Sequence, residues 1–507
     1  MGKRISRLTV AQVIAGSNPV RPPTRKLMPH QLKMLRHLKA RRHSALFCEM
    51  RTGKTLPTVR YSRRLQPLRG ELRCIVVAPT SALGSWEKEL GIEGETDVVY
   101  LQGTRDERLA ALREGHRWNL INKEGWMVLP EIANRERCGL CRGKGKAGPE
   151  KAKCGGCAGR GYVPMDRQEF LWDIVAVDES SCLKNPKAKI TKFFLSGFRD
   201  SAHRVVLTGT PNPESELDMW CQVAFLHGSA YRCSSYWQFR AGWFSQTDAL
   251  DWYPNPGTLD MMREETARVA FVCTRRDADM PDRKVHETRS LTMPKKLRDA
   301  YDSAEEDFVL EYDGEDVDST IYAGVRWQWM RRMCGGFIGD ECVWRGKVDE
   351  LVNLLRGELA REQVVVWYAY NKEIDFSEKC LLSAGISAMI LYGPVAPAER
   401  RRRITAFTKG DVRVLLVQQK VAEFGADLSA ADTAIVYSRH AALLTNQQSE
   451  DRIVHPQKTV PLLYVDLTVR DTVDEDLTEL IREKKFRSQK LLDRALMERV
   501  RQRRGCI

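Results

Sequence analysis

The chain has 507 residues, of which 43% are hydrophobic and 29% are charged. This balance is typical of a folded protein and excludes a disordered one, while the length predicts two or more domains with separate apolar cores. No apolar run approaches a membrane span, and the N-terminal stretch MGKRISRLTVAQVIAG lacks the apolar segment of a secretory signal, so we expect a cytoplasmic protein without a membrane partner.

Net charge also bears on the partner. The formal charge of +14 favours a polyanion such as nucleic acid, because each neutralised phosphate releases counterions, but many basic proteins bind none. Ten of the fourteen cysteines are scattered without the spacing of a disulfide framework, so we expect reduced thiols there.

Two series of apolar runs lie along the chain. Between about 27 and 226 the runs are SALFCEM, CIVVAP, WMVLP, DIVAVDE and RVVLTGT; from about 346 they are QVVVWYAY, AMILYG, VRVLLVQQ, TAIVYS and VPLLYVDL. Alternation of such runs with helix-length segments predicts parallel sheets flanked by helices. The predicted fold class is therefore α/β, with two tandem lobes at 27–226 and 346–485.

Three further segments complete the predicted organisation. Residues 1–26 form an N-terminal segment, and 227–345 form a helical inter-lobe region, rich in Trp, Tyr and Arg, that we expect to bridge the lobes. Residues 486–507 form a basic C-terminal helix. The stretch from Leu480 onward carries ten Lys and Arg against three Asp and Glu, and it either packs on the second lobe or tracks DNA.

A phosphate-binding loop is predicted directly after the run SALF. In CEMRTGKT (48–55), a strand ends in a loop that opens a helix, which directs backbone N–H groups at phosphates. Lys54 would place a charge on the β- and γ-phosphates, and the Thr55 hydroxyl would ligate magnesium. Cys48 stands where such a loop usually begins with glycine.

An acidic pair follows one domain-length later. Asp178 and Glu179 come directly after the apolar strand 173–177. ATP hydrolysis needs a carboxylate for magnesium and a base that orients water, and this pair supplies both. Two exposed acids at a strand end would be the alternative for an isolated pair.

These motifs and their order resemble the Swi/Snf-type branch of the superfamily-two helicases. CEMRTGKT looks like motif I, APTSAL (78–83) with Trp86 looks like motif Ia, and LINKEG (120–125) looks like motif Ib. DESSCLKNP (178–186) resembles motif II in its Swi/Snf form, and LTGTP (207–211) resembles motif III. PHQ (29–31) is similar to the glutamine motif that reads adenine.

The second lobe continues the resemblance, which spans about 27–485. GKVDEL (346–351) resembles the entry into that lobe, VVVWY (364–368) motif IV, EFGADL (423–428) motif V and QSEDRIVHPQ (448–457) motif VI. The resemblance implies RecA-like lobes that bind a nucleotide between Lys54 and Arg452, an arginine finger. His455 stands in place of a second motif VI arginine, so turnover would be slow or would depend on a partner. Ser181 stands in place of a motif II histidine, so a shorter side chain would make the contact with motif III.

The resemblance implies a role for each matched residue. The expected catalytic residues are Lys54, Asp178, Glu179 and Arg452, and magnesium would be held by Thr55 and Asp178. The expected nucleotide-binding residues are Gln31, Arg51, Thr52, Gly53, Lys54, Thr55, Asp178, Gly425, Arg452 and His455. The expected DNA-contacting residues are Pro79, Thr80, Ser81, Asn122, Thr208 and Gly209.

Four further cysteines form a separate signal within 131–165. Cys138-x2-Cys141 and Cys154-x2-Cys157, twelve residues apart, have the spacing of a four-thiolate zinc site, and a redox pair is the alternative. Each pair continues as C-x-x-C-x-G-x-G, which resembles the repeat of DnaJ-type zinc domains. Residues 131–165 hold eight Lys and Arg against three Asp and Glu, so the insert would contact the nucleic-acid backbone or recruit a partner protein.

Together these features predict a nucleic-acid-dependent ATPase motor, a DNA helicase or translocase, with ATP, Mg²⁺ and Zn²⁺ as cofactors. DNA is favoured over RNA, through backbone contacts with little sequence preference. Compact relatives in bacteriophages make a replication or recombination partner plausible, and a monomer is expected. The alternatives are a catalytically weakened DNA-binding scaffold and an RNA helicase.

Overall fold

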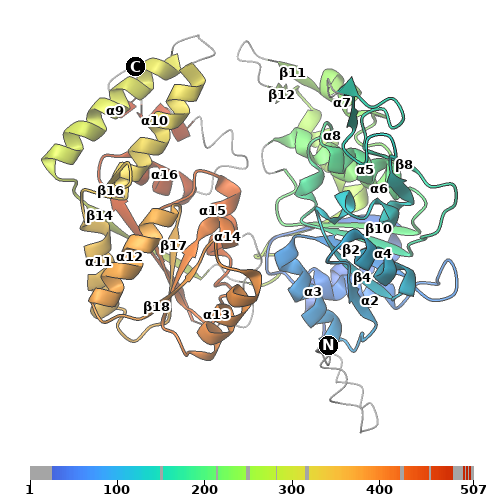
Figure 1. Ribbon diagram of the computed structural model, residues 1–507, viewed down its shortest axis with the longest axis horizontal. Coiled ribbons are helices and arrows are strands. Elements are labelled where there is room, and N and C mark those ends of the chain that lie inside the picture. Colours follow the sequence, from blue (N-terminus) through green and yellow to red (C-terminus); the bar gives the residue numbers. More distant parts are fainter. Residues whose placement is uncertain are drawn as a thin grey trace, which may run out of the picture. The chain divides into compact units, whose positions relative to one another are not determined.

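The computed structural model describes residues 25–148, 152–212, 215–246, 252–280, 283–313, 319–422, 427–455, 458, 460–482, 495–496, 498–500 and 502–503. It divides into two compact units (Figure 1). The first unit comprises Met1–Pro211 and Leu217–Ala278, and the second comprises Asn212–Glu216 and Asp279–Ile507. Residues 1–24, Gly425 and most of the predicted C-terminal helix lie outside the described residues.

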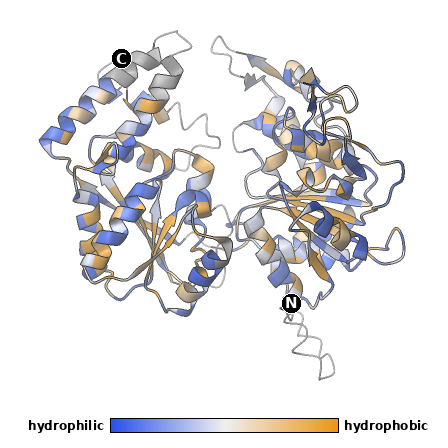
Figure 2. Cartoon of the chain, viewed as in Figure 1, coloured by the Kyte–Doolittle hydropathy of each residue, from blue (hydrophilic) through white to orange (hydrophobic). Residues whose placement is uncertain are grey.

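The first unit contains a parallel sheet of seven strands in the order β13-β1-β10-β9-β2-β4-β3. The strands are β1 (His43–Cys48), β2 (Cys74–Ala78), β3 (Val98–Tyr100), β4 (Trp118–Asn122), β9 (Ile174–Asp178), β10 (His203–Thr208) and β13 (Ala270–Cys273). Its main helices are α1 (Pro29–Ala40), α2 (Thr55–Ser62), α3 (Thr80–Ile92), α4 (Arg105–Glu114), α5 (Lys189–Gly197), α6 (Met219–His227) and α8 (Thr258–Val269). The central strands are hydrophobic along their length because helices cover both faces (Figure 2).

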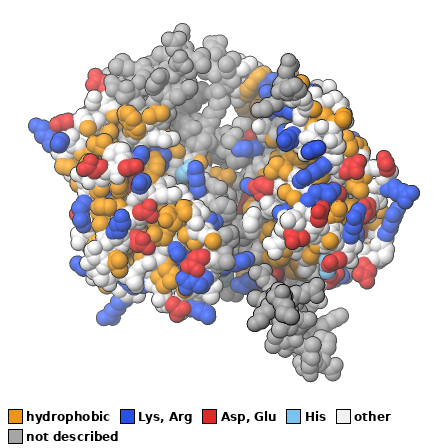
Figure 3. Space-filling model, viewed as in Figure 1, with side chains coloured by type: hydrophobic (Ala, Val, Ile, Leu, Met, Phe, Trp, Pro, Cys, Tyr) orange, Lys and Arg blue, Asp and Glu red, His pale blue; other side chains and the backbone are white. Residues whose placement is uncertain are grey.

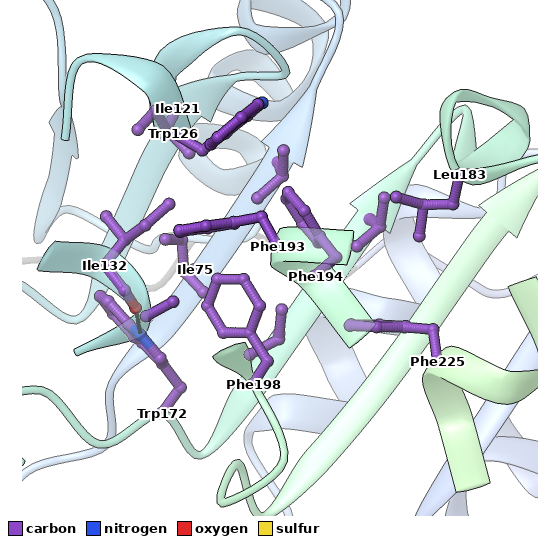
Figure 4. Close-up of a cluster of buried hydrophobic side chains, with 14 of the residues drawn as sticks. Ile75, Ile121, Trp126, Ile132, Trp172, Leu183, Phe193, Phe194, Phe198 and Phe225 are labelled. Atoms are coloured by element: carbon purple, nitrogen blue, oxygen red, sulfur yellow. Dashed lines mark hydrogen bonds between the residues drawn. The ribbon is translucent and has the colours of Figure 1, made fainter. Parts of the chain in front are cut away.

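The core of the first unit is rich in aromatic side chains. Phe193 of α5 packs against Trp126, and Phe194 and Phe198 pack against Phe193 and each other (Figure 4). Trp172 donates through Nε1 to the Ile132 carbonyl at 2.6 Å. A buried indole N–H needs such an acceptor. The core therefore binds the segments before and after the cysteine insert to the sheet.

The second unit contains a parallel sheet of six strands in the order β14-β21-β20-β17-β19-β18. The strands are β14 (Lys284–Leu291), β17 (Val364–Tyr368), β18 (Ala388–Leu391), β19 (Val414–Gln418), β20 (Thr433–Val436) and β21 (Leu462–Val469). The helices around it are α11 (Gly346–Arg356), α12 (Asn371–Ser383), α13 (Pro397–Lys409), α14 (Gln419–Ala422), α15 (Leu443–Glu450) and α16 (Val473–Arg482). The predicted α/β fold with two parallel-sheet lobes is confirmed.

The stretch 227–345 differs from the helical region that its pattern predicts. It contains α7 (Tyr236–Trp243), α8, α9 (Lys295–Asp313) and α10 (Ser319–Cys334), but also β13 in the first sheet and β14 in the second. Strand β14, KVHETRSL, is a largely polar edge strand that pairs residue by residue with β21. A polar edge strand has no apolar run, so its sequence does not reveal it.

One predicted strand is also wrong. The run WMVLP (126–130) forms the short 3₁₀ helices η2 (Gly125–Met127) and η3 (Pro130–Ala133), and the strand before it is β4. Gly125 directly precedes the run and Pro130 ends it, which leaves too few residues between them for a ladder. Motif Ib therefore begins on β4 and ends in η2.

Charged side chains are scattered over the surface of both units, among hydrophobic and uncharged ones (Figure 3). Lys and Arg side chains are interspersed with Asp and Glu on the face in view (Figure 3). At the C-terminal end of the chain, Val500 is fully buried, and Arg503 forms ion pairs with Glu305 and Asp476. Arg503 therefore packs on the second unit.

Among the described residues, no helix combines the length and apolar character needed to cross a membrane.

Candidate functional site

The phosphate loop joins β1 to α2 in a conformation that requires glycine. Arg51 and Gly53 both have positive φ, 69° and 73°. A Cβ on Gly53 would lie 2.4 Å from Nε2 of Gln31, closer than real Cβ contacts come. A side chain at Gly53 would be strained by this φ and would displace the Gln31 amide from the loop, so glycine is favoured where the loop and α1 come into contact.

Lys54 lies folded into the loop. Its Nζ donates to the carbonyls of Cys48 at 2.8 Å and Glu49 at 3.3 Å. The Thr52 hydroxyl donates to the same Glu49 carbonyl at 2.8 Å. Three hydrogen bonds from two side chains thus bind two carbonyls of the loop, and the Lys54 ammonium lies within the loop that is predicted to receive phosphate.

Helix α1 supports the loop from the side. Gln31 donates through Nε2 to the Gly53 carbonyl at 3.2 Å and accepts from the Met28 N–H at 3.0 Å. The His30 Nε2 atom lies 2.9 Å from the Thr52 carbonyl oxygen. Both side chains are buried, so Gln31 is bound to the loop itself, and the expected adenine contact stays a prediction.

A second support comes from β13. The Glu49 N–H donates to the Cys273 carbonyl at 2.9 Å, and the Glu49 carboxylate accepts from the Arg275 N–H at 2.9 Å. The Arg275 Nε atom forms an ion pair with the same carboxylate at 3.4 Å. The sequence did not reveal this support, because β13 lies 222 positions after the end of β1 and reaches it only through sheet pairing.

The acidic pair lies at the end of β9, as predicted. Asp178 accepts the Glu179 N–H through Oδ1 at 3.0 Å. Glu179 has a φ of 49°, a left-handed conformation that turns the chain sharply after the strand. Such strain at a non-glycine residue is typical of functional positions. The turn separates the directions of the two carboxylates.

Trp86 is a further functional candidate, which the sequence marked only as part of motif Ia. Its Nε1 donates to Oδ2 of Asp178 at 2.9 Å, and the indole is fully buried on α3. A hydrogen bond to a carboxylate in a dry setting is stronger than one in water. Trp86 therefore fixes the position of Oδ2 and, with it, the orientation of the Asp178 carboxylate.

Thr208 and Gly209, expected to contact DNA, both lie beside residues of the predicted nucleotide site. Thr208 is fully buried, donates to Glu179 Oε2 at 3.5 Å and accepts the Thr210 N–H at 3.1 Å. A Cβ on Gly209 would lie 3.1 Å from the Met50 side chain of the phosphate loop. A fully buried threonine has no surface for DNA, so Thr208 connects motif III to motif II. Gly209 is half-buried, and its expected DNA contact stays a prediction.

The expected contact of Ser181 with motif III is made by its neighbour. The Ser180 hydroxyl donates to Gln222 Oε1 at 2.8 Å, and the Gln222 amide donates to the carbonyls of Pro211 and Asp218. All of these groups are largely buried. The absence of a histidine at Ser181 is therefore offset by a link through Gln222 of α6.

The remaining DNA candidates share the same edge of the sheet. The parallel register pairs Phe47 with Thr208, Leu207 with Asp178, and Ala78 with Asn122, so the carboxyl ends of five strands lie level. Thr80 is exposed at the start of α3, Pro79 is half-buried before it, and Ser81 is described only by its helical backbone. Ligands bind at this edge in open parallel sheets.

Arg452 of the second unit follows α15, whose end is tied down by buried ion pairs. Arg439 bonds Glu450 at 2.9 Å and Asp466 at 2.7 Å, and Lys284 bonds Asp451 at 2.9 Å. Burial disfavours the charged form of Asp466, but Arg439, His286 and Arg482 together outweigh burial and lower the pKa of this carboxyl to about 2. His455 is half-buried a few residues further on, so both predicted motif VI residues follow a rigid helix end.

The four predicted zinc ligands come together in the first unit. Their Sγ atoms all lie within 4.8 Å of one another, and all four side chains are buried. The N–H groups of Gly145 and Gly161 donate to the Sγ atoms of Cys141 and Cys157, each at 3.2 Å. Donors aimed at sulfur stabilise thiolates, which are the metal-binding form. This donor set fits a tetrahedral zinc ion.

Two family models match the chain. The SNF2-related domain matches residues 29–320, more than half of the chain, and the helicase conserved C-terminal domain matches residues 346–456. The first range includes every candidate of the first unit, and the second includes Arg452 and His455.

The chain is also similar in sequence to curated proteins and in fold to a solved structure. The ATP-dependent DNA helicase DDM1 of Arabidopsis thaliana is 20% identical over 84% of this chain and 56% of its own length, and Protein CHROMATIN REMODELING 19 of the same plant is 21% identical over 93% and 69%. The Hef helicase domain of Pyrococcus furiosus is similar in fold, with a TM-score of 0.51 and 11% identity over 89% of this chain and 98% of that one. The chain spans little more than half the length of the first relative.

Proposed function

The chain belongs to the SNF2-related domain family, and from this premise we propose that it is a DNA-dependent ATPase that moves along DNA. One observation carries the proposal: the phosphate loop, the acidic pair and Thr208 lie on adjacent strands at one edge of a single sheet. Phosphoryl transfer needs a phosphate cradle, a metal carboxylate and a water-orienting base within one site. The first unit supplies these three parts.

Each residue of the edge has a part in this proposal. The backbone of Arg51–Gly53 and the Lys54 ammonium would hold the phosphates, and Thr55 with Asp178 would hold Mg²⁺, which supplies charge neutralisation when bound. Lys54 would exchange its two carbonyl acceptors for phosphate oxygens, which are stronger acceptors for a cation. Glu179, held by Thr208, would orient the attacking water.

Arg452 is the residue of the second unit that we propose for stabilising charge on the transferred phosphoryl group. Its place after a helix end held by Arg439 and Lys284 supports this role, because a catalytic guanidinium must be positioned by a rigid base. His455 and Gly425 would complete the nucleotide contacts of this unit.

DNA would be bound through its phosphates by Pro79, Thr80, Ser81 and Asn122. The residues after β2 and β4 lie level with the nucleotide edge, and α3 carries Trp86 to Asp178. Contacts to phosphates carry no base information, so little sequence preference is expected. The family membership favours translocation on duplex DNA.

We further propose that Cys138, Cys141, Cys154 and Cys157 hold one Zn²⁺, since the four buried sulfurs are close enough to share an ion. A phage-like setting in the host cytoplasm, a replication or recombination partner and a monomeric state are proposed from the sequence resemblance alone. Fluorescence imaging of the tagged chain and its sedimentation behaviour would test the location and the oligomeric state.

ATP turnover tests the proposal directly. We expect duplex DNA to stimulate turnover of the wild-type chain, and Lys54→Ala to reduce it by roughly a hundredfold or more, because the charge on the phosphates is lost. Lys33→Ala, which removes an exposed lysine from α1, is the matched control and should turn over normally. Turnover that RNA alone stimulates would support the RNA helicase, and no turnover with any nucleic acid would support the weakened scaffold; either result contradicts the proposal.

A further inference from the structure

The cysteine insert is built from two knuckles with the same geometry. Residues Arg142 and Ala158, which follow the second cysteine of each pair, both have a φ of 49°. The Cys138 N–H donates to the Gly161 carbonyl and the Cys154 N–H to the Gly145 carbonyl, both at 3.0 Å. Each knuckle therefore completes the other, and the loops between the cysteines and glycines have defined positions.

The insert is anchored to the core of the first unit. It is closed by strands β5 (Arg135–Arg137) and β8 (Tyr162–Pro164), which pair antiparallel. Tyr162 packs edge-on against Trp126 and Phe193, with ring centroids 6.2 and 5.1 Å apart, and Figure 4 shows Trp126 beside Phe193 in that core. A surface carried by such an anchor keeps its orientation relative to the sheet.

The surface of the insert carries exposed cations, called the basic face below, that form no ion pair with the acids that the structure describes. Five cations on the knuckle loops and their hairpin are exposed and form no ion pair among the residues that the structure describes: Arg142, Lys144, Lys146, Lys153 and Arg160. Elsewhere in this unit, Arg60, Arg63 and Arg113 are paired with glutamates. In the described part of the insert, the exposed acid is Glu136.

Two of these cations lie where their charges repel each other. Strands β6 (Lys146–Ala147) and β7 (Ala152–Lys153) form a two-stranded ladder in which Lys146 lies directly opposite Lys153. Like charges opposite each other destabilise a ladder, and a bound anion would remove this cost. A row of phosphates is the anion that suits several exposed cations within one small insert.

The insert begins close to the DNA candidates. Trp126 follows Asn122 by four positions, through η2, and Asn122 ends β4 at the carboxyl edge of the sheet. The Arg137 guanidinium donates to the Met127 carbonyl at 3.3 Å and the Val128 carbonyl at 3.4 Å, which ties the first knuckle to this connection. The basic face is therefore fixed to the segment that follows motif Ib.

We propose that the basic face of the cysteine insert is a second contact for the DNA backbone, separate from the contacts at the ends of β2 and β4. The inference rests on the proposed function in that it takes the same DNA as the ligand. On this proposal, the insert binds DNA whether or not a nucleotide is bound. Charge, and not base recognition, is what this face offers, so duplexes of any sequence bind it alike.

Equilibrium binding at several salt concentrations tests this proposal without nucleotide. A fluorescein-labelled duplex is titrated with the wild-type chain and with Lys144→Ala/Lys146→Ala/Lys153→Ala. A plot of log K against log salt should be less steep for the variant, by roughly two to three, because each lost phosphate contact reduces the steepness by about 0.9. Affinity at about 0.15 M salt should fall tenfold or more. Zinc content measured by mass spectrometry should be unchanged, which separates loss of charge from loss of fold.

Two matched variants complete the test. The charge-preserving variant Lys144→Arg/Lys146→Arg/Lys153→Arg should bind as the wild type does. The variant Lys39→Ala/Arg64→Ala/Arg69→Ala removes three exposed cations near the amino ends of the strands of the first sheet, away from the carboxyl edge. It should change affinity less than about twofold. Wild-type binding together with an unchanged slope in the insert variant would overturn this inference alone and favour a protein partner; a wild-type chain that binds no duplex would overturn the proposed function as well.

Discussion

Trp86 donates a hydrogen bond from its indole Nε1 to Oδ2 of Asp178, over 2.9 Å. Trp86 lies on α3, which begins at Thr80, directly after the β2 end that we propose for DNA contact. Asp178 is the carboxylate proposed for magnesium. A single buried bond thus connects the DNA side of the first unit with the nucleotide side, so a shift of α3 reaches Asp178 without an intermediate residue.

Replacing Trp86 with Phe should lower DNA-stimulated ATP turnover by about tenfold. Phenylalanine keeps an aromatic ring, smaller than the indole, and loses the N–H donor to Asp178. A hydrogen bond to a charged group contributes about 1.5–3 kcal/mol. Trp118→Phe is the control, because Trp118 is equally buried, lies 6.4 Å away and bonds Glu95 instead. Turnover measured against Mg²⁺ concentration should show a higher metal requirement for Trp86→Phe only; equal behaviour of the two variants would remove Trp86 from the site.

Thr208→Val should reduce turnover while leaving DNA affinity unchanged. Valine has the shape of threonine but no hydroxyl, so the contact with Glu179 and the acceptor for the Thr210 N–H are both lost. We expect a roughly tenfold lower kcat, since each lost bond contributes about 1 kcal/mol. Thr191→Val, which removes a buried hydroxyl bonded to Leu183, is the control. A drop in DNA affinity with normal kcat would restore Thr208 to a DNA role.

Gly145→Ala should release metal from the cysteine insert. The residue has a φ of 75°, and its Cβ would lie 2.3 Å from the carbonyl oxygen of Gly159, so the two knuckles would have to separate. Gly139→Ala is the control, because a Cβ there meets nothing within 4 Å. Metal content and hydrogen exchange of residues 135–164 would be compared; retention of full metal by Gly145→Ala would mean that the knuckles do not hold it together.

Glu373→Gln should change how the stability of the second unit depends on pH. Burial raises the pKa of Glu373 from 4.5 to about 7, although the Ser438 hydroxyl donates to this carboxylate. Because the folded state keeps this proton and the unfolded state loses it, stability falls as pH rises from about 4.5 to 7. Glutamine carries no such proton, so relative to the wild type the variant should gain roughly 2–3 kcal/mol between these pH values.

Hydrogen exchange at α12 and β17 measures this free energy of unfolding locally. Glu378→Gln is the control, since Glu378 is exposed on the same helix and should leave the wild-type pH profile in place. A Glu373→Gln profile parallel to that of the wild type would show that Glu373 does not titrate in this range.

Arg503→Ala should lower the stability of the second unit and leave DNA binding alone. Glu305 is fully buried, and both it and Asp476 would lose their cation. Removing one partner of a largely buried ion pair costs about 1–3 kcal/mol. The measurement is urea unfolding together with the salt dependence of duplex binding. A flatter salt slope with unchanged unfolding would assign Arg503 to DNA.

The α/β class and the order of the motifs were predictable from local pattern. The apolar runs before Glu49 and Asp178 mark buried parallel strands, and a parallel sheet brings the residues after its strands to one edge. Cysteine spacing likewise predicted the cluster of four sulfurs, because two short loops with fixed spacing can close around one metal ion. Such signals are carried by a few consecutive residues.

The partners of these residues were not predictable. The bond between Trp86 and Asp178 joins positions 92 apart, and the Glu49–Arg275 contact joins positions 226 apart. Thr208 was expected to face DNA, yet strand pairing turns it toward Glu179. Direction, burial and pairing depend on which strands become neighbours, and this is a property of the folded chain that no local run of residues encodes.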